Sequence, residues 1–150
     1  MNYQETLDFL YHRLPVFQRD GSAALDLKLD RTLQFMQYLS EPHKAFKSVH
    51  IAGTNGKGSV SHMIASVLQH AGYQVGLYTS PHLKDFRERI RINGACISEE
   101  KVIDFVLTHK SFIEEFKPSF FELTVAMAFD HFAAQAIDIA VVEVGMGGRL

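Results

Sequence analysis

Apolar residues recur at helical spacing along some stretches of the chain and in short continuous runs along others. Helical spacing near the N-terminus predicts two helices, the first ending at Pro15 and the second running from about Leu25 to Leu39, before Pro42. Their apolar stripes are Leu7, Leu10, Tyr11 and Leu14, and Leu29, Leu33, Met36 and Leu39.

The region after these helices reads as a strand, a glycine-rich turn, a helix and a second strand. SVHIA (48–52) and YQVGLY (73–78) are the strand candidates, and VSHMIASVLQHAG (60–72) is the helix between them. One face of that helix carries Val60, Met63, Ile64, Val67 and Leu68. This order predicts a βαβ unit, and therefore an α/β fold with a parallel sheet flanked by helices.

The next stretch, TSPHLKDFRERI (79–90), has no clean period and is predicted to be a long loop. Asn93 and Gly94 lie between alternating residues of 90–98, which is a strong signal for a β-hairpin. Ser98 is then expected to cap a helix that runs to about Phe116.

The last third of the chain predicts one further helix and a buried strand. Ser119 and Glu122 have the spacing of a capping box at the start of that helix. The segment DIAVVEVGMGGRL (138–150) is almost wholly apolar, as in a strand covered on both faces.

Composition describes a globular chain of about one domain. It has 150 residues, of which 47% are hydrophobic, and a net charge of −2, which gives no reason to expect nucleic acid or a membrane as a partner. The single cysteine, Cys96, cannot form an internal disulfide. With no signal-peptide pattern and no apolar run of the ~18 residues that span a membrane, we expect a soluble, cytoplasmic protein.

The glycine-rich turn is a candidate phosphate-binding loop, in which backbone N–H groups, the start of a helix and a lysine surround phosphate. Its residues are Gly53, Thr54, Asn55, Gly56, Lys57, Gly58 and Ser59. The match to G-x-x-x-x-G-K-[ST] is imperfect, because Ile51 stands at the first glycine and Gly58 separates Lys57 from Ser59. Similar turns occur without ligands, so the pattern favours phosphate without naming the nucleotide.

Glu143 is the only charged residue in IAVVEVGMGG, near the end of a predicted strand where α/β sheets place ligands. A buried carboxylate costs several kcal/mol unless it is paired or bound to a cation. The alternatives are a salt bridge to an arginine and a Mg²⁺ ion, and we favour Mg²⁺.

Four blocks, HIAGTNGKGS, GLYTSPHL, the segment from Phe86 to Gly94 and VVEVGMGGRL, resemble folylpolyglutamate synthase and the bifunctional dihydrofolate/folylpolyglutamate synthase of the Mur ligase superfamily. The glycine after Lys57 is typical of this folate branch, whereas the cell-wall branch usually reads GTxGKT/S. The resemblance implies the N-terminal part of the superfamily's central P-loop ATPase domain. N-terminal helices would occupy 1–47, the nucleotide-binding βαβ unit 48–78, a folate-site loop and hairpin 79–98, and helices and a buried strand 99–150. The family's C-terminal Rossmann-like domain would be absent, so we expect a fragment that is inactive alone.

The resemblance also implies an activity: ATP-dependent addition of L-glutamate to dihydropteroate or reduced folates through an acyl phosphate, with Mg²⁺, by a monomeric enzyme. Lys57 and Glu143 would be catalytic, and Ser80 and Glu143 would hold the metal. His82, Phe86 and Arg89 are candidate substrate contacts, each as easily structural. Glu122 has two open interpretations, a substrate contact or a capping residue. The competing functions are another Mur-type amide ligase and a non-catalytic P-loop nucleotide-binding domain.

Overall fold

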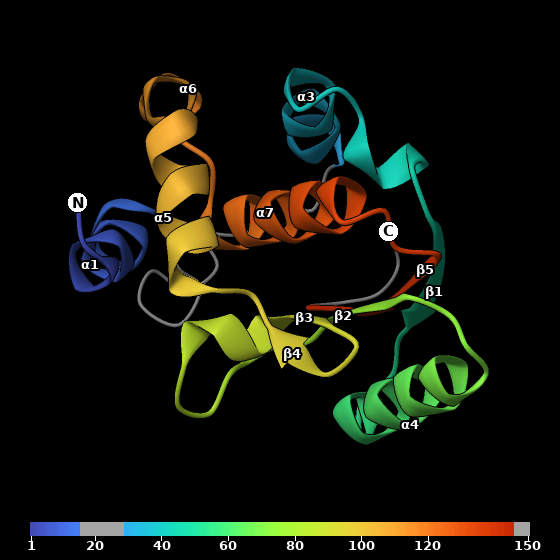
Figure 1. Ribbon diagram of the computed structural model, residues 1–150. Coiled ribbons are helices and arrows are strands. Elements are labelled where there is room, and N and C mark those ends of the chain that lie inside the picture. The colour runs from blue at the N-terminus through green and yellow to red at the C-terminus, as the bar shows by residue number, and fades with distance from the viewer. Residues whose placement is uncertain (16–28, 146–150) are drawn as a thin grey trace.

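A computed structural model describes residues 1–15 and 29–145, and within them a mixed five-stranded sheet is covered by helices on both faces. Figure 1 shows α4 alone on one side of the sheet and α7, with the other α-helices around it, on the opposite side. The elements are α1 (Tyr3–Arg13), α3 (Asp30–Tyr38), η2 (Pro42–Lys44), β1 (Lys47–Ile51), α4 (Lys57–His70), β2 (Val75–Tyr78), η3 (Phe86–Arg89), β3 (Ile90–Ile92), β4 (Ala95–Cys96), α5 (Glu99–Thr108), α6 (Lys110–Phe116), α7 (Phe120–Ala134) and β5 (Ile139–Glu143).

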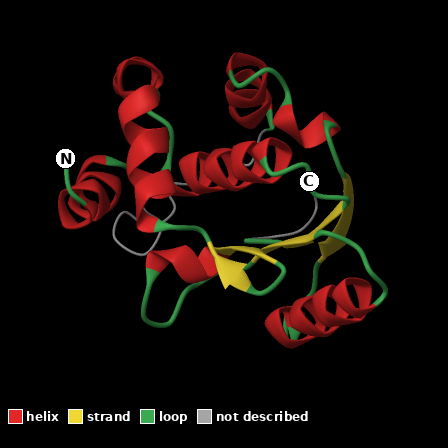
Figure 2. Ribbon diagram, in the orientation of Figure 1, coloured by secondary structure: helices red, strands yellow, loops and turns green. Residues whose placement is uncertain are grey.

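The strand order is β1-β5-β2-β3-β4, and the first three strands are parallel (Figure 2). The predicted α/β fold with a parallel βαβ unit is therefore confirmed, with β5 inserted between its two strands. The sheet is not wholly parallel, because β3 runs antiparallel to β2. The strands β1, β5 and β2 run in one direction. Their last residues, Ile51, Glu143 and Tyr78, therefore lie at the same edge of the sheet.

The hairpin predicted between 90 and 98 is present. Asn93 (φ 49°) and Gly94 (φ 82°) both have left-handed backbone, as a two-residue turn of the Asn-Gly type requires. The Asn93 side chain also accepts the N–H of Val75, at 2.9 Å, which ties the turn to the first residue of β2.

The single helix predicted from Ser98 to Phe116 is wrong, because the chain forms two helices there. Ser98 caps α5 as expected, but His109 (φ −104°, ψ 11°) separates α5 from α6. The break is accompanied by packing against α3, where the ring of Tyr38 stacks on Phe112 at 3.7 Å and the Tyr38 hydroxyl contacts His109 Nδ1 at 3.0 Å. Tertiary aromatic contacts thus override a continuous helical pattern.

The apolar stripe predicted for the second helix is also wrong in part. Leu29 and Leu33 are exposed, whereas Met36 of the predicted stripe is buried as expected, together with Phe35, which the stripe did not include. Residues 25–28 of the predicted helix, and 146–150 of the last predicted strand, lie outside the described residues.

The main core lies between the sheet and α7, which buries Leu123, Ala126 and Met127 almost completely. On the other face, Ile64 and Leu68 of α4 pack against a smaller cluster around Val141. The remaining apolar residues of the predicted α4 face, Val60, Met63 and Val67, are exposed. No helix in the described ranges is long and apolar enough to cross a membrane.

Candidate functional site

The glycine-rich turn connects the end of β1 to the start of α4. Gly53 (φ 152°) and Gly56 (φ 76°) have backbone conformations that side chains disfavour, so the turn depends on glycine at these positions. Gly56 is the N-cap of α4, and the helix begins at Lys57. The Lys57 ammonium group folds back over the turn and donates to the carbonyl oxygen of Gly53 at 2.9 Å. A helix N-terminus, its free N–H groups and an ammonium group therefore meet at one place, as phosphate binding requires.

Glu143 ends β5 and is paired in register with Ile51, the last residue of β1. Its side chain is buried, with 6% of the residue exposed, and makes no ion pair within the described residues. Burial raises the pKa of Glu143, while the N–H of Ser80 and the positive charge of Lys57 act in the opposite direction. The arginine salt bridge considered as an alternative is not found in the described part of the chain.

Ser80 follows β2 by two residues, and its backbone N–H lies close enough to the Glu143 carboxylate to act against the rise in its pKa. Gly58 approaches the same carboxylate from α4, since a Cβ built on Gly58 would lie 3.8 Å from Glu143 Oε2. Lys57, Gly58, Ser80 and Glu143 thus converge from three separate segments at the carboxyl edge of the parallel strands.

The donor set around Glu143 suits Mg²⁺ better than a transition metal. No three His, Cys, Asp or Glu side chains cluster in residues 1–15 and 29–145, which excludes a metal cage built from these side chains alone within those ranges. Mg²⁺ is commonly held by one or two carboxylates together with phosphate oxygens and water. A buried carboxylate without an ion pair, beside a hydroxyl residue and the glycine-rich turn, fits that pattern.

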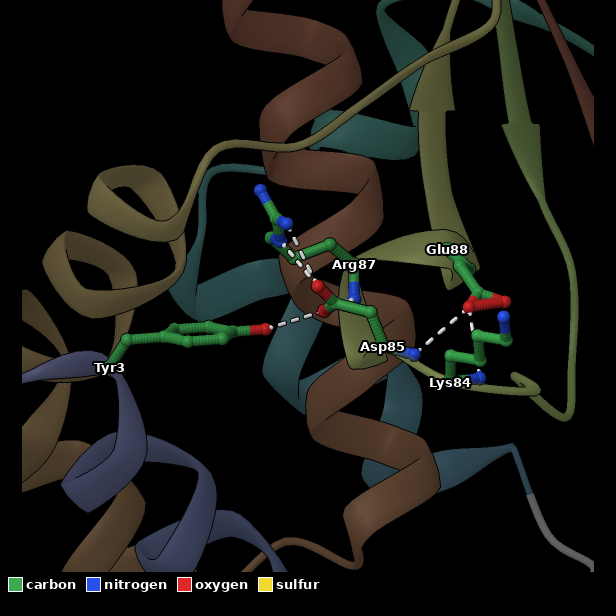
Figure 3. A network of polar contacts seen from close by, with 5 residues as sticks. All are labelled: Tyr3, Lys84, Asp85, Arg87 and Glu88. Atoms are coloured by element: carbon green, nitrogen blue, oxygen red, sulfur yellow. Dashed lines mark hydrogen bonds and ion pairs between the residues drawn. The ribbon is translucent and has the colours of Figure 1, made fainter.

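The loop after β2 is held together by two carboxylates (Figure 3). Glu88 accepts the N–H groups of Leu83, Lys84 and Asp85 at 3.2, 3.0 and 2.9 Å. Asp85 accepts the side-chain N–H groups of Arg87 at 3.0 and 2.8 Å, and these bonds are the main reason that its pKa falls to about 2. The hydroxyl of Tyr3, from α1, also donates to Asp85 at 2.9 Å. The predicted loop is therefore an ordered segment that contains η3 and is bound to the N-terminal helix.

His82 in this loop has both ring nitrogens engaged. Its Nδ1 accepts from Arg89 Nε at 2.7 Å, and its Nε2 lies 3.1 Å from the hydroxyl of Tyr11 in α1. Burial, and next the charge of Arg89, lower the pKa of His82. Arg89 is itself buried, 8% exposed, with its guanidinium group 5.2 Å from the ring centroid of Phe120.

The two other candidate substrate residues lie in structural roles. Phe86 is 1% exposed and packs in the core against His82 and Phe120. Glu122 forms the predicted capping box with Ser119, so that interpretation is confirmed, and it also pairs with Arg31 Nε at 3.5 Å. Contact of either residue with substrate stays a prediction.

Sequence reasoning did not single out Phe121, which is 46% exposed at the start of α7. Its ring lies against Gly145, where a Cβ would overlap it, and edge-on to Tyr78. The adjacent residues Phe120 and Phe121 are the sequence feature that could have indicated it. Neighbouring residues in a helix face different directions, so Phe120 enters the core while Phe121 faces the edge of the sheet.

Comparisons with known proteins agree on one group of relatives, although no family model matches the chain. The dihydrofolate synthase/folylpolyglutamate synthase of Bacillus subtilis is 38% identical over 154 residues, covering 98% of this chain and 34% of the relative. The crystal structure of folylpolyglutamate synthase from Thermotoga maritima superposes with a TM-score of 0.87 at 45% identity, over 99% of this chain and 34% of that one. A complex of FPGS with AMPPCP and folate has a TM-score of 0.86 at 35% identity, over 99% and 36% of the two chains. The chain spans only 18% to 35% of the length of the curated relatives it matches.

Proposed function

The chain is a relative of the folylpolyglutamate synthases and dihydrofolate synthases over its whole length, and on that premise we propose that it forms the nucleotide-binding part of an ATP-dependent ligase. The ligase adds L-glutamate to dihydropteroate, to reduced folates, or to both. The observation that carries the proposal is the convergence of the Lys57 turn, Ser80 and the buried, unpaired Glu143 at one sheet edge.

The reaction needs a cationic site because two anions, the γ-phosphate of ATP and the acceptor carboxylate, must approach each other. Phosphorylation of the carboxylate supplies a leaving group, and the amine of glutamate then displaces phosphate from the acyl phosphate. Most of the rate enhancement in such transfers comes from positioning and from charge stabilisation. The N–H groups from Thr54 to Ser59 would bind the outer phosphates, with Lys57 moving from Gly53 O to the transferred group.

Glu143 and the Ser80 hydroxyl are the residues that would hold Mg²⁺, which when bound would neutralise phosphate charge. The Ser80 N–H and Gly58 both lie beside the Glu143 carboxylate, which brings it next to the start of α4. Because burial raises the pKa of Glu143, a nearby cation is also what would keep it ionised at neutral pH.

We place the acceptor along the loop after β2, with Arg89 as the contact for its negative charge and His82, Phe86 and Glu122 as further predicted contacts. The exposed ring of Phe121 offers an aromatic surface beside the same edge. We further propose that the working protein is a cytoplasmic monomer of folate biosynthesis. In that protein the N-terminal helices would occupy residues 1–47 and the nucleotide-binding unit 48–78. The folate-site loop and hairpin would occupy 79–98, and the helices and strand that complete the sheet 99–150. A C-terminal Rossmann-like domain would follow.

The test measures incorporation of labelled L-glutamate by the full-length protein, with ATP and Mg²⁺, into dihydropteroate and into a reduced folate separately. Lys57→Ala should reduce kcat by at least about 100-fold, because one positive charge on the transferring group contributes several kcal/mol. Lys47→Ala, at the start of β1 and away from the turn, is the matched control. Near-normal kcat in Lys57→Ala would contradict the assignment of Lys57. Nucleotide binding without transfer to any acceptor would favour a non-catalytic P-loop domain.

A further inference from the structure

The loop after β2 is held by hydrogen bonds more than by buried side chains. Leu83 at its tip is 92% exposed, and its neighbour Lys84 is exposed as well. Between residues 81 and 88, Phe86 is the only residue that is fully buried. Segments with so few buried contacts open easily unless polar contacts hold them.

We propose that Glu88, Asp85 and Tyr3 are positioning residues, which hold this loop in its acceptor-binding shape before the acceptor arrives. None of the three needs to touch the acceptor for this role. The inference deepens the proposed function, and its effect on turnover rests on that function.

Glu88 closes the loop from within. Its Oε1 accepts the N–H of Leu83 at 3.2 Å, and its Oε2 accepts those of Lys84 and Asp85 at 3.0 and 2.9 Å. Figure 3 shows the carboxylate turned towards these two backbone nitrogens. The same bonds, led by that from Asp85, lower the pKa of Glu88. Because bonds to an ionised carboxylate are stronger than those between neutral groups, one side chain fixes three successive residues.

The three bonded residues lie between two of the predicted acceptor contacts, His82 and Arg89. With residues 83–85 folded onto Glu88, the two ends of this segment meet, and Arg89 Nε lies 2.7 Å from His82 Nδ1. The base of the loop is closed by the N–H of Thr79, which donates to the carbonyl oxygen of Arg89 at 3.1 Å. The distance between the two predicted contacts is therefore set by bonds within the loop itself.

Asp85 joins the closed loop to helix α1. The Tyr3 hydroxyl donates to Asp85 Oδ1 at 2.9 Å, and the Arg87 guanidinium group lies 5.9 Å from the centre of the Tyr3 ring. Helix α1 is itself fixed, because Phe9 and Leu10 on it are buried in the main core. Tyr3 thus connects the loop to the core of the molecule.

Preorganisation of this kind affects binding of the acceptor rather than the chemical step. A loop that already has its binding shape costs less free energy to order when a ligand binds. If that shape is present only part of the time, the apparent affinity falls in proportion, while the bound state is unchanged. Loss of these bonds should therefore raise KM for the acceptor alone. The phosphate turn is built separately, between β1 and α4, so KM for ATP should not follow.

Glu88→Gln and Tyr3→Phe test this in glutamate transfer by the full-length protein, with dihydropteroate and a reduced folate as acceptors. Glutamine keeps the size of the side chain, but its NH₂ group replaces one of the two accepting oxygens. We expect KM for the acceptor to rise on the order of 10-fold in Glu88→Gln and about 2- to 5-fold in Tyr3→Phe. The kcat at saturating acceptor and KM for ATP should stay unchanged.

The matched controls are Glu115→Gln and Tyr73→Phe, at exposed positions in α6 and before β2, and neither should alter any of these constants. A lower kcat without a change in KM for the acceptor would overturn the proposal. So would a parallel rise in KM for ATP, because that pattern indicates general loss of structure.

A measurement without turnover separates this inference from the proposed function. Trypsin cleaves after lysine, so cleavage between Lys84 and Asp85 in the native protein, followed by mass spectrometry, reports how often the loop opens. Without acceptor, cleavage should be slow in the unsubstituted protein and in Glu115→Gln, and on the order of 10-fold faster in Glu88→Gln, with other lysines unaffected.

The two measurements together give distinct outcomes. Equal cleavage rates in the unsubstituted protein and Glu88→Gln would refute the inference even if glutamate transfer is found. Transfer with an unchanged KM for the acceptor in both variants would refute the positioning role and leave the proposed function standing. The expected cleavage pattern without transfer to either acceptor would refute the proposed function, and the positioning role with it.

Discussion

The contact between Tyr3 and Asp85 gives a prediction whose size can be worked from the structure. Tyr3→Phe removes one hydroxyl that donates to Asp85 at 2.9 Å and leaves the ring in place (Figure 3). The fall of the Asp85 pKa from 3.8 to about 2 corresponds to about 2.4 kcal/mol at 1.36 kcal/mol per pKa unit. Since about a third of the Asp85 side chain is exposed, screening reduces this to about 1–2 kcal/mol. Arg87 contributes most of it, so we expect about 0.5–1 kcal/mol for Tyr3.

The assay is a double-mutant cycle in urea with the unsubstituted protein, Tyr3→Phe, Asp85→Ala and the double variant. The coupling free energy should be about 0.5–1 kcal/mol at pH 7. Asp85 has a depressed pKa in the folded protein, so its stabilisation is present above pH 3.8 and is lost as the pH falls through about 2. Coupling measured near neutral pH should therefore weaken in acid.

Additive effects of the two substitutions at pH 7 would refute the reasoning, because they would mean that α1 and the loop are not joined through this bond. Glu5→Gln is a suitable control. Glu5 lies on α1, and among the described residues it takes part only in the capping box with Asn2 and in a contact with the N-terminal amine, so its substitution should not couple to Asp85→Ala.

Two further predictions concern the sheet edge and the hairpin. Glu143→Gln should leave the thermal stability measured without Mg²⁺ unchanged or raise it, because a buried charge without an ion pair is removed. The same substitution should weaken Mg²⁺-dependent ATP binding by about 10-fold or more. A loss of both stability and binding would contradict this prediction. Gly94→Ala should lower the free energy of unfolding in urea by about 1 kcal/mol, because Gly94 has a φ of 82° and open space around it. Gly94→Asn should lower it by less, since asparagine tolerates left-handed backbone better. Equal losses would point to a cause other than backbone conformation.

Local signals predicted local structure well in this chain. The hairpin follows from Asn93-Gly94, the start of α5 from Ser98, and the start of α7 from Ser119 and Glu122, since each depends on hydrogen bonds between residues a few positions apart. The place of the glycine turn between a strand and a helix was predicted for the same reason.

The features that the sequence did not predict depend on contacts between residues far apart in the chain. The break at His109 accompanies aromatic contacts with Tyr38, and the burial of Phe35 rather than Leu33 follows from the place of α3 beside α7. The partners of His82 are a tyrosine in α1 and the last arginine of η3, which no spacing in the loop indicates. Whether a charged side chain forms an ion pair can be judged only after its neighbours are known. Glu122 pairs with Arg31, whereas the buried Arg89 forms no ion pair within the described residues.

The glycine after Lys57 and the buried carboxylate of Glu143 are best understood as one constraint. Register places Glu143 beside Ile51, so the chain leaves β1 next to the carboxylate and returns to it at Gly58 after a short turn. A side chain at position 58 would begin beside the Glu143 carboxylate, with its Cβ 3.8 Å from Oε2. Glycine at this position would leave room for a cation held by that carboxylate. The common phosphate-loop pattern puts a hydroxyl residue directly after the lysine. We propose that Ser80, two residues after the end of β2, supplies the hydroxyl instead, which would leave position 58 free to be glycine.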